Sequence, residues 1–135
     1  MQALPTFLLL AGGWLCAAGP QEPAPEPDPP LAGIWKGDAV CATETPSCET
    51  ERIVLSITDI TDKPGYVLIR AERIADGKTI SLGAGESQYN RAQHTLVMQA
   101  EQRVWTLTVM GEHIEGTLAL PDNTVLRRLA LRKEG

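Results

Sequence analysis

The chain has 135 residues, with 12 basic and 17 acidic side chains, so its formal net charge at pH 7 is −5. All of the basic side chains lie after residue 30, where acidic side chains nearly balance their charge. This part of the sequence has no long basic stretch that could bind the phosphate backbone of a nucleic acid. We therefore exclude nucleic acid as a partner and expect one domain of ordinary size.

Residues 1–18 have the layout of a secretory signal peptide. An apolar run from Phe7 to Leu15 is followed by small residues that offer a cleavage site after position 18. The run is shorter than the roughly 20 apolar residues that span a bilayer. A lipid anchor on Cys16 is the alternative, although bacterial lipoprotein signals place a small residue where Leu15 stands. We predict export to the periplasm or the cell exterior and no membrane span in the mature chain.

Residues 19–30 form a proline-rich segment. Proline at alternating positions removes backbone donors and fixes φ, which excludes helix and central strand and favours a solvated polyproline-II spacer. Glu22, Glu26 and Asp28 make the segment acidic. We interpret it as a tether, with a ligand for proline-binding domains as the alternative, and place the folded domain at residues 31–135.

The hydrophobic period of this domain is two, which predicts strands. The turn signals between them are compact, as in Asp76-Gly77 and Pro121-Asp122-Asn123. Connections this short suit antiparallel neighbours and leave no room for a crossover helix. We predict an all-β fold, a single antiparallel eight-stranded up-and-down barrel, with a sandwich as the alternative. The expected strands cover residues 34–41, 52–58, 66–73, 79–85, 94–100, 104–110, 114–120 and 124–133.

An eight-stranded barrel is either filled by side chains or wide enough for one small ligand. The expected inward positions mix large apolar residues with alanine and glycine, so a cavity for a small apolar molecule is one hypothesis. The candidate lining residues are Ala71, Leu82, Met98, Trp105 and Leu118.

The sequence Gly33-Ile34-Trp35 at the first strand resembles the start of lipocalin-like barrels. The resemblance implies that the indole closes one end of the barrel and that an arginine of the last strand lies across it through a cation–π contact. Trp35 would be this plug, with Arg127 as the first choice for the arginine and Arg132 as the second.

Cys41 and Cys48 stand six residues apart near the end of the first strand. In an exported protein this predicts a disulfide, which stabilises a short loop by about 2–3 kcal/mol. The rival interpretation is a thiolate site for copper or zinc. The stretch also resembles the N-terminal barrel of the envelope copper-stress lipoprotein, in which the paired cysteines are closer together. A thiol or copper sensor therefore stays as an alternative.

Nearly the whole domain resembles a family of small uncharacterised exported bacterial proteins. The shared motifs are G-x-W-x-G, C-x6-C, a V-W-x-L-T-V-like strand, E-G-T-L-x-L-P-D-x-T and a basic last strand. Here they cover residues 33–37, 41–48, 104–109, 115–124 and 127–133. The resemblance implies a lipocalin-like barrel and export, and it implies no activity.

No catalytic constellation stands out. His113 and Glu115 share one face of a strand, which is the solvent face if Ile114 points inward. Glu49 and Glu51 lie beside a turn and are expected in solvent. The glycines of the 83–85 stretch predict a bulge or bend. We predict no enzyme, no metal and no cofactor.

Two roles fit these features. The first is a module that binds a small apolar ligand, as the barrel interior suggests. The second is an envelope protein that binds a protein partner, as an inhibitor or an assembly accessory, which export, the tether and the missing catalytic set suggest.

Overall fold

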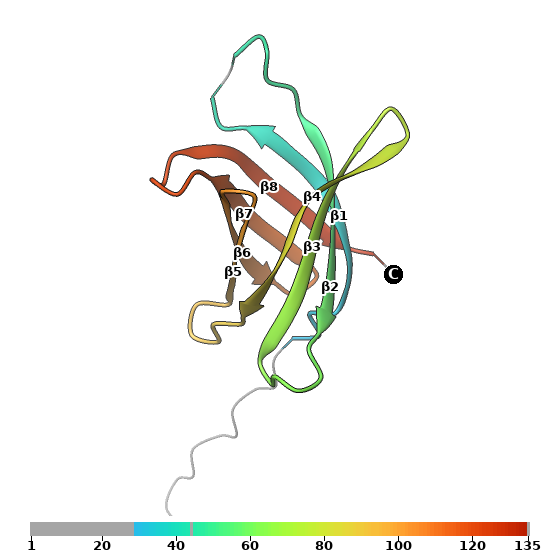
Figure 1. Cartoon of the computed structure of the whole chain (residues 1–135), viewed down its shortest axis with the longest axis vertical. Coiled ribbons are helices and arrows are strands. Elements are labelled where there is room, and N and C mark those ends of the chain that lie inside the picture. The colour runs from blue at the N-terminus through green and yellow to red at the C-terminus, as the bar shows by residue number, and fades with distance from the viewer. Residues whose placement is uncertain (1–28, 44, 135) are drawn as a thin grey trace, which may run out of the picture.

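The computed structural model describes residues 29–43 and 45–134, and within them it contains strands and no helix. Figure 1 shows the strands as a single layer that curls around a common interior. The eight strands are β1 (Gly33–Cys41), β2 (Glu51–Asp59), β3 (Tyr66–Ala75), β4 (Lys78–Gln88), β5 (Thr95–Ala100), β6 (Arg103–Met110), β7 (His113–Ala119) and β8 (Val125–Lys133).

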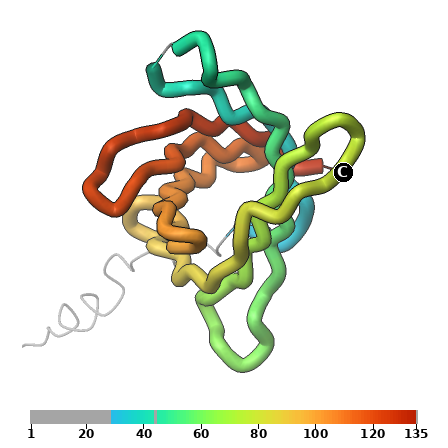
Figure 2. Tube along the Cα trace, turned by 45° about the horizontal axis from the view of Figure 1, so that its top comes forward, coloured from blue at the N-terminus to red at the C-terminus, as the bar shows by residue number. Residues whose placement is uncertain are grey.

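The strands form one sheet in the order β4-β3-β2-β1-β8-β7-β6-β5. Every pair of neighbours is antiparallel, and β1 joins the two halves by pairing with both β2 and β8. The tube in Figure 2 follows these strands around a nearly closed ring. The predicted eight-stranded up-and-down barrel is therefore confirmed, and its architecture is consistent with a lipocalin-like barrel.

The seam of the barrel lies between β4 and β5, which are the two ends of the sheet order. The Val97 N–H donates to the Ser87 hydroxyl across the seam at 2.8 Å. A Cβ atom added at Gly83 would lie 2.8 Å from the Ala100 Cβ, and one added at Gly85 would lie 3.0 Å from the Met98 Cγ. Glycine is therefore the residue that lets β4 approach β5 closely.

A bulge in β4 accompanies this approach. Ala71 pairs with Gly83 and Glu72 pairs with Ser81, so Leu82 is an extra residue opposite β3. This irregularity confirms the bulge predicted near the glycines of the 83–85 stretch. Such a bulge bends the strand and increases its twist, which helps a sheet to close.

Tight turns join the strands where the sequence tolerates positive φ. Asp76 and Gly77 have φ values of 52° and 76° in the two-residue turn between β3 and β4. Glu101 and Gln102 have φ values of 51° and 57° in the turn between β5 and β6. Two consecutive positive φ values match the right-handed twist of a hairpin. The second turn has no sequence signal as strong as Asp-Gly.

Alternation along the strands divides the residues into an inner and an outer set. In β6, for example, Trp105, Leu107 and Val109 are buried, while the residues between them are partly exposed. The inner sets meet in one continuous apolar cluster, whose members include Trp35, Ile53, Leu55, Ile57, Ile69, Leu96, Met98, Trp105, Leu107, Ile114, Leu129 and Leu131. Burial of such side chains contributes about 1.5–3 kcal/mol for each large one.

Trp35 lies within this cluster near the beginning of β1 and is fully buried. Its indole N–H donates to the Leu31 carbonyl oxygen at 3.0 Å. The Lys133 ammonium lies 5.6 Å from the centre of the Trp35 ring and donates to the Pro30 carbonyl oxygen at 2.6 Å. The segment before β1 therefore folds against the indole, and Lys133 binds both.

The predicted signal peptide and most of the predicted tether fall in residues 1–28, which lie outside the described residues. In the part of the chain that the structure describes, no helix has the length and the apolar character needed to cross a membrane.

Replacement of Gly83 by alanine tests the seam. G83A places a methyl group against Ala100, and Gly83 has a φ of +123°. G65A is the matched control, because Gly65 has a φ of +85° and nothing within 4 Å of an added Cβ. We expect G83A to lower the free energy of unfolding by about 1–3 kcal/mol more than G65A in urea titrations, because overpacking adds to backbone strain. Equal losses for the two variants would show that the seam is loosely packed.

Candidate binding site at the mouth of the barrel

We call the mouth the end of the barrel at which β1, β3, β5 and β7 end and the other strands begin. Three charged residues of β8, β2 and β3 meet there, namely Arg127, Glu51 and Arg73. Each stands two residues from a buried apolar residue of its own strand, so the alternation turns its side chain toward the interior.

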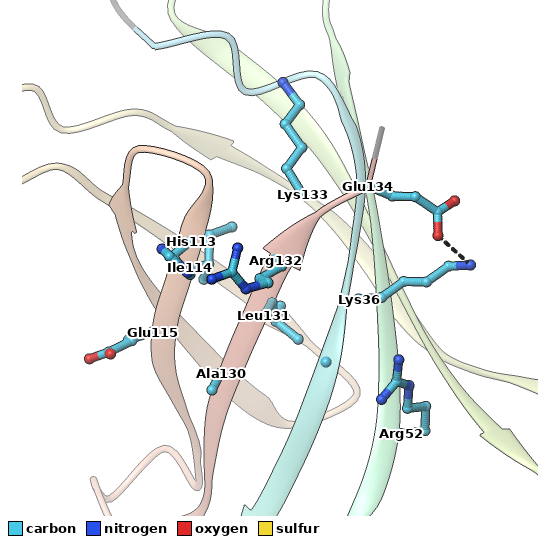
Figure 3. Close-up of a pocket in the computed structure, with 11 residues that line it drawn as sticks. Lys36, Arg52, His113, Ile114, Glu115, Ala130, Leu131, Arg132, Lys133 and Glu134 are labelled. Carbon is cyan, nitrogen blue, oxygen red and sulfur yellow. Dashed lines mark ion pairs between the residues drawn. The ribbon is translucent and has the colours of Figure 1, made fainter.

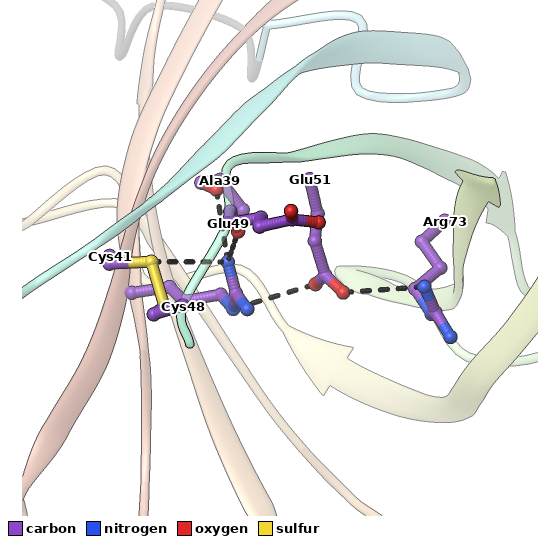
Figure 4. Close-up of polar contacts among 7 residues, drawn as sticks. Ala39, Cys41, Cys48, Glu49, Glu51 and Arg73 are labelled. Atoms are coloured by element: carbon purple, nitrogen blue, oxygen red, sulfur yellow. Dashed lines mark hydrogen bonds and ion pairs between the residues drawn. A yellow bond between two sulfur atoms is a disulfide. The ribbon is translucent and has the colours of Figure 1, made fainter. Parts of the chain in front are cut away.

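Glu51 bridges the two arginines of this cluster, and Figure 4 shows its ion pair with Arg73 as a dashed line. Its Oε1 atom lies 3.4 Å from the Arg127 Nε, and its Oε2 atom lies 3.5 Å from the Arg73 Nη1. Both distances are longer than those of short charge-assisted hydrogen bonds, which are about 2.7–2.9 Å. The side chains of Arg127, Glu51 and Arg73 are 18%, 25% and 34% exposed. The cluster is thus partly buried and holds two guanidinium groups for one carboxylate.

Arg127 also holds the loop between β1 and β2. Cys41 and Cys48 form a disulfide that closes this loop, as predicted. The Arg127 Nη1 donates to the Glu49 carbonyl oxygen at 2.6 Å and to the Ala39 carbonyl oxygen at 3.3 Å, and it lies 3.8 Å from the Cys41 Sγ. One guanidinium group therefore connects β8, β1 and the residues just before β2.

The sheet register connects this arginine with three of the predicted lining residues. Met98 pairs with Trp105, Trp105 with Leu118, Leu118 with Arg127, and Arg127 with Cys41. These residues form one row across five neighbouring strands. The row begins in the apolar interior and ends at the disulfide, so Met98, Trp105 and Leu118 lie in the same wall as Arg127.

Trp105 is the unusual member of this row. Its side chain is 1% exposed, and its indole N–H is buried without a hydrogen-bond acceptor among residues 29–43 and 45–134. Trp35 differs, because its N–H is bonded to Leu31. A buried N–H group without an acceptor costs about 1–3 kcal/mol relative to a bonded one. The wall of the barrel therefore offers an unused donor below the mouth.

The other two predicted lining residues are Ala71 on β3 and Leu82 on β4. Both strands belong to the half of the sheet on the other side of the seam from β5. Ala71 is fully buried, whereas Leu82 is partly buried and packs against the apolar cluster. All five predicted lining residues therefore contact or belong to the core.

A pocket of about 640 Å³ opens at the mouth. It lies between the β1–β2 loop, which contributes Glu49 and Thr50, and the β3–β4 hairpin, which contributes Asp76 and Lys78. Glu51, Arg73 and Arg127 belong to its wall, whereas the five predicted lining residues do not. Arg127 is thus the residue shared by the pocket and by the row that contains Trp105.

Two sequence-based expectations are corrected here. The cation over Trp35 is Lys133, not Arg127 or Arg132, because the β1–β8 register pairs Trp35 with Lys133 and places Arg127 opposite Cys41 at the mouth. Glu51 is not a solvated carboxylate, because it lies in phase with the buried residue Ile53 and faces the two arginines.

Sequence reasoning missed the charged cluster, although its signal is present. Glu51 and Arg73 extend the inward alternation of their strands by one step at the mouth. The general rule that polar residues near turns lie in solvent fails for both residues. The inward and outward alternation of residues along each strand is the signal that identifies them.

His113 and Glu115 are exposed on the outer face of β7, as their spacing predicts. Among residues 29–43 and 45–134, no group of three or more histidine, cysteine, aspartate or glutamate side chains could hold a metal ion. Glu86 raises the pKa of Lys63 through a hydrogen bond and its charge, and the Thr124 backbone N–H lowers the pKa of Asp122 by hydrogen bonding. Neither Lys63 nor Asp122 lines the mouth pocket.

The sequence matches no model of a protein family and no curated protein.

Replacement of Arg127 by glutamine tests the role of this residue in the mouth. R127Q leaves the Glu49 and Ala39 carbonyl groups without this donor, and it leaves Glu51 with Arg73 as its remaining cation. We expect it to lower the free energy of unfolding by about 2–3 kcal/mol in urea titrations. R128Q is the matched control, because Arg128 is the exposed neighbour on the same strand, and its loss should stay within about 0.5 kcal/mol. A loss for R127Q as small as that for R128Q would mean that the observed contacts do not stabilise the mouth.

Proposed function

We propose that the domain binds a small, mainly apolar molecule in the mouth half of the barrel and does so without catalysing a reaction. The observation that carries the proposal is the Trp105 indole N–H, which is buried and has no acceptor in the described part of the chain. A ligand that presents a carbonyl, hydroxyl or carboxylate oxygen to this N–H would supply the missing hydrogen bond.

The surroundings of Trp105 suit an apolar body. Its register neighbours are the apolar residues Met98 and Leu118. Methionine is unbranched and polarisable, so its side chain can shift to admit a ligand. Apolar neighbours and one adaptable side chain beside a donor that lacks an acceptor favour a compact molecule with a single polar group.

The mouth pocket provides the entrance in this proposal. Its volume of about 640 Å³ lies within the roughly 300–1,000 Å³ that is usual for small-molecule sites. The ligand would pass through it, so that its polar group reaches the Trp105 N–H while its apolar body packs against Met98 and Leu118. Displacement of side chains between the pocket and Trp105 accompanies binding in this account.

The cellular setting remains part of the proposal. A disulfide is typical of proteins in oxidising compartments, and it supports export to the periplasm or the cell exterior. The same bond occupies both sulfur atoms, and thiolates are the form of cysteine that binds metals. The disulfide therefore favours the ligand-binding role over a copper or thiol sensor.

The two buried indoles permit a direct test by NMR. The exported protein is labelled with ¹⁵N and titrated with octanol, 2-octanone and octanoate, and the indole N–H signals are followed. We expect the Trp105 signal to move downfield as its N–H gains an acceptor, while the Trp35 signal stays in place because its N–H is already bonded. W105F assigns the signal and should weaken binding about five- to thirtyfold, because one hydrogen bond contributes about 1–2 kcal/mol.

Three results would contradict the proposal. The first is that the Trp105 signal does not move with any of the compounds. The second is that both indole signals move equally, which would indicate a general change of the protein. The third is a long-lived water molecule bonded to the Trp105 N–H in the absence of ligand, since water would then be the missing acceptor.

A further inference from the structure

The seam between β4 and β5 is the junction of the barrel that no backbone ladder holds. These two strands end the sheet order, whereas all other neighbouring strands are joined by hydrogen bonds. The junction of β1 and β8, which also joins strands far apart in the sequence, shows the difference. Its ladder covers residues 35–41 of β1, and the ion pair between Lys36 and Glu134, at 2.7 Å, adds a second tie (Figure 3). The seam is therefore the junction at which the barrel can widen at the lowest cost.

The end of the seam opposite the mouth is tied by hydrogen bonds. There residues 89–94 join the two strands, and the Asn90 and Thr95 backbones exchange bonds of 2.9 and 3.2 Å. The next tie toward the mouth is the bond of 2.8 Å from the Val97 N–H to the Ser87 hydroxyl. Ser87 is only 4% exposed, so this bond is shielded from water.

Closer to the mouth, glycine contacts hold the seam. Gly85 lies against the Met98 side chain, which is fully buried. Gly83 lies against Ala100, which is partly buried, at the last residue of β5. Contacts between apolar atoms are individually weak and have no preferred direction, so they separate at a lower cost than a ladder of hydrogen bonds. The strength of the seam thus decreases from the 89–94 loop toward the mouth.

Met98 connects the seam with the interior site. It pairs with Trp105 in the β5–β6 ladder, and Gly85 faces its side chain from the other side of the seam. The inner residues already form one continuous apolar cluster, and protein interiors leave few voids. A ligand that packs against Met98 therefore needs additional space. Separation of β4 from β5 would supply this space beside the Trp105 indole.

We propose that the seam is a gate for the apolar ligand of the interior. In the open form, β4 and β5 separate from the mouth end, the bond between Ser87 and Val97 breaks, and residues 89–94 act as the hinge. The inference rests on the proposed function, because it describes how the same site gains room for its ligand. Only the open form takes up the ligand, and the closed form is the one that the structure shows.

The position of the mouth pocket agrees with this direction of opening. Lys78 and Ile80, near the beginning of β4, line the pocket, and Gly83 and Gly85 of the same strand lie on the seam. The pocket therefore leads to the end of the seam that has no hydrogen-bonded tie in the order described above. A ligand that passes through the pocket reaches the two strands where they separate most easily.

The Ser87 hydroxyl offers a selective way to favour the open form. S87A leaves the Val97 N–H without its acceptor in the closed form, whereas water can bond to this N–H in the open form. S56A is the matched control, because Ser56 lies on β2, which has ladders with both β1 and β3. When only a minor form binds, the apparent Kd falls as the population of that form rises.

Titration of the purified protein with octanol, 2-octanone and octanoate, followed by NMR, tests the gate. We expect S87A to bind the probes about two- to tenfold more tightly than the wild type, which is the factor that one hydrogen bond contributes. S56A should stay within about 1.5-fold of the wild type. A role of Ser87 in stability alone would lower the unfolding temperature of S87A without this gain in affinity.

Nuclear Overhauser effects across the seam provide a second measurement. In the wild type saturated with a probe, we expect the contact between Gly83 and Ala100 to be lost, whereas the contact between Asn90 and Thr95 remains. Relaxation dispersion without any probe should show exchange on the microsecond to millisecond timescale at Gly83 and Ala100, and S87A should increase it.

The outcomes separate the gate from the proposed function. The gate is wrong if a probe binds but S87A binds it no more tightly than S56A, or if the contact between Gly83 and Ala100 persists at saturation. If no probe binds, the proposed function fails, and relaxation dispersion decides on the gate, because flat profiles at the seam would overturn it. Should S87A not fold, G85A replaces it, since its methyl group would lie 3.0 Å from the Met98 Cγ in the closed form.

Discussion

The antiparallel ladder between β1 and β8 is the interaction on which the rest of the structure depends. It joins the first and last strands, so two four-stranded halves become one sheet that can curl into a barrel. A shift of this ladder by one residue would exchange the inner and outer faces of β8. The ladder therefore determines that Lys133 meets Trp35 at one end and that Arg127 meets the disulfide at the other.

The charged residues on the two faces of β8 have different surroundings. Its inner face begins with Arg127 at the mouth, continues with apolar residues and finishes with Lys133, so a cation lies at each end of the core. Its outer face presents Arg128 and Arg132 to solvent. The basic last strand is therefore not a single patch, because alternation distributes its charges between structural contacts inside and an accessible surface outside.

Much of the fold could be predicted from the sequence, because alternation and turn chemistry are local properties. The strand number, the antiparallel connections and the disulfide follow from them. The partner of Trp35 could not be predicted in this way, because Arg127 and Lys133 share one face of β8 and only the register with β1 distinguishes them. The same reason applies to Arg132, whose position between Lys36 and His113 requires the register of three strands.

The candidate site was only partly predictable for a further physical reason. Met98, Trp105 and Leu118 could be named as inner residues from their phase alone, and the structure places them in one row. Whether an indole N–H finds an acceptor depends on backbone carbonyl groups and side chains from other segments. The Trp35 N–H has an acceptor in the segment before β1, and the Trp105 N–H has none among the residues that the structure describes, although both residues are inner residues of their strands.

The most direct test of this account is the register of β1 against β8 in solution. Backbone nuclear Overhauser effects in the purified protein would measure it. We predict contacts that join Trp35 with Lys133, Gly37 with Leu131 and Cys41 with Arg127. Contacts that join Trp35 with Arg132 instead would contradict the account, because Arg127 would then face solvent and the mouth would lose its central residue.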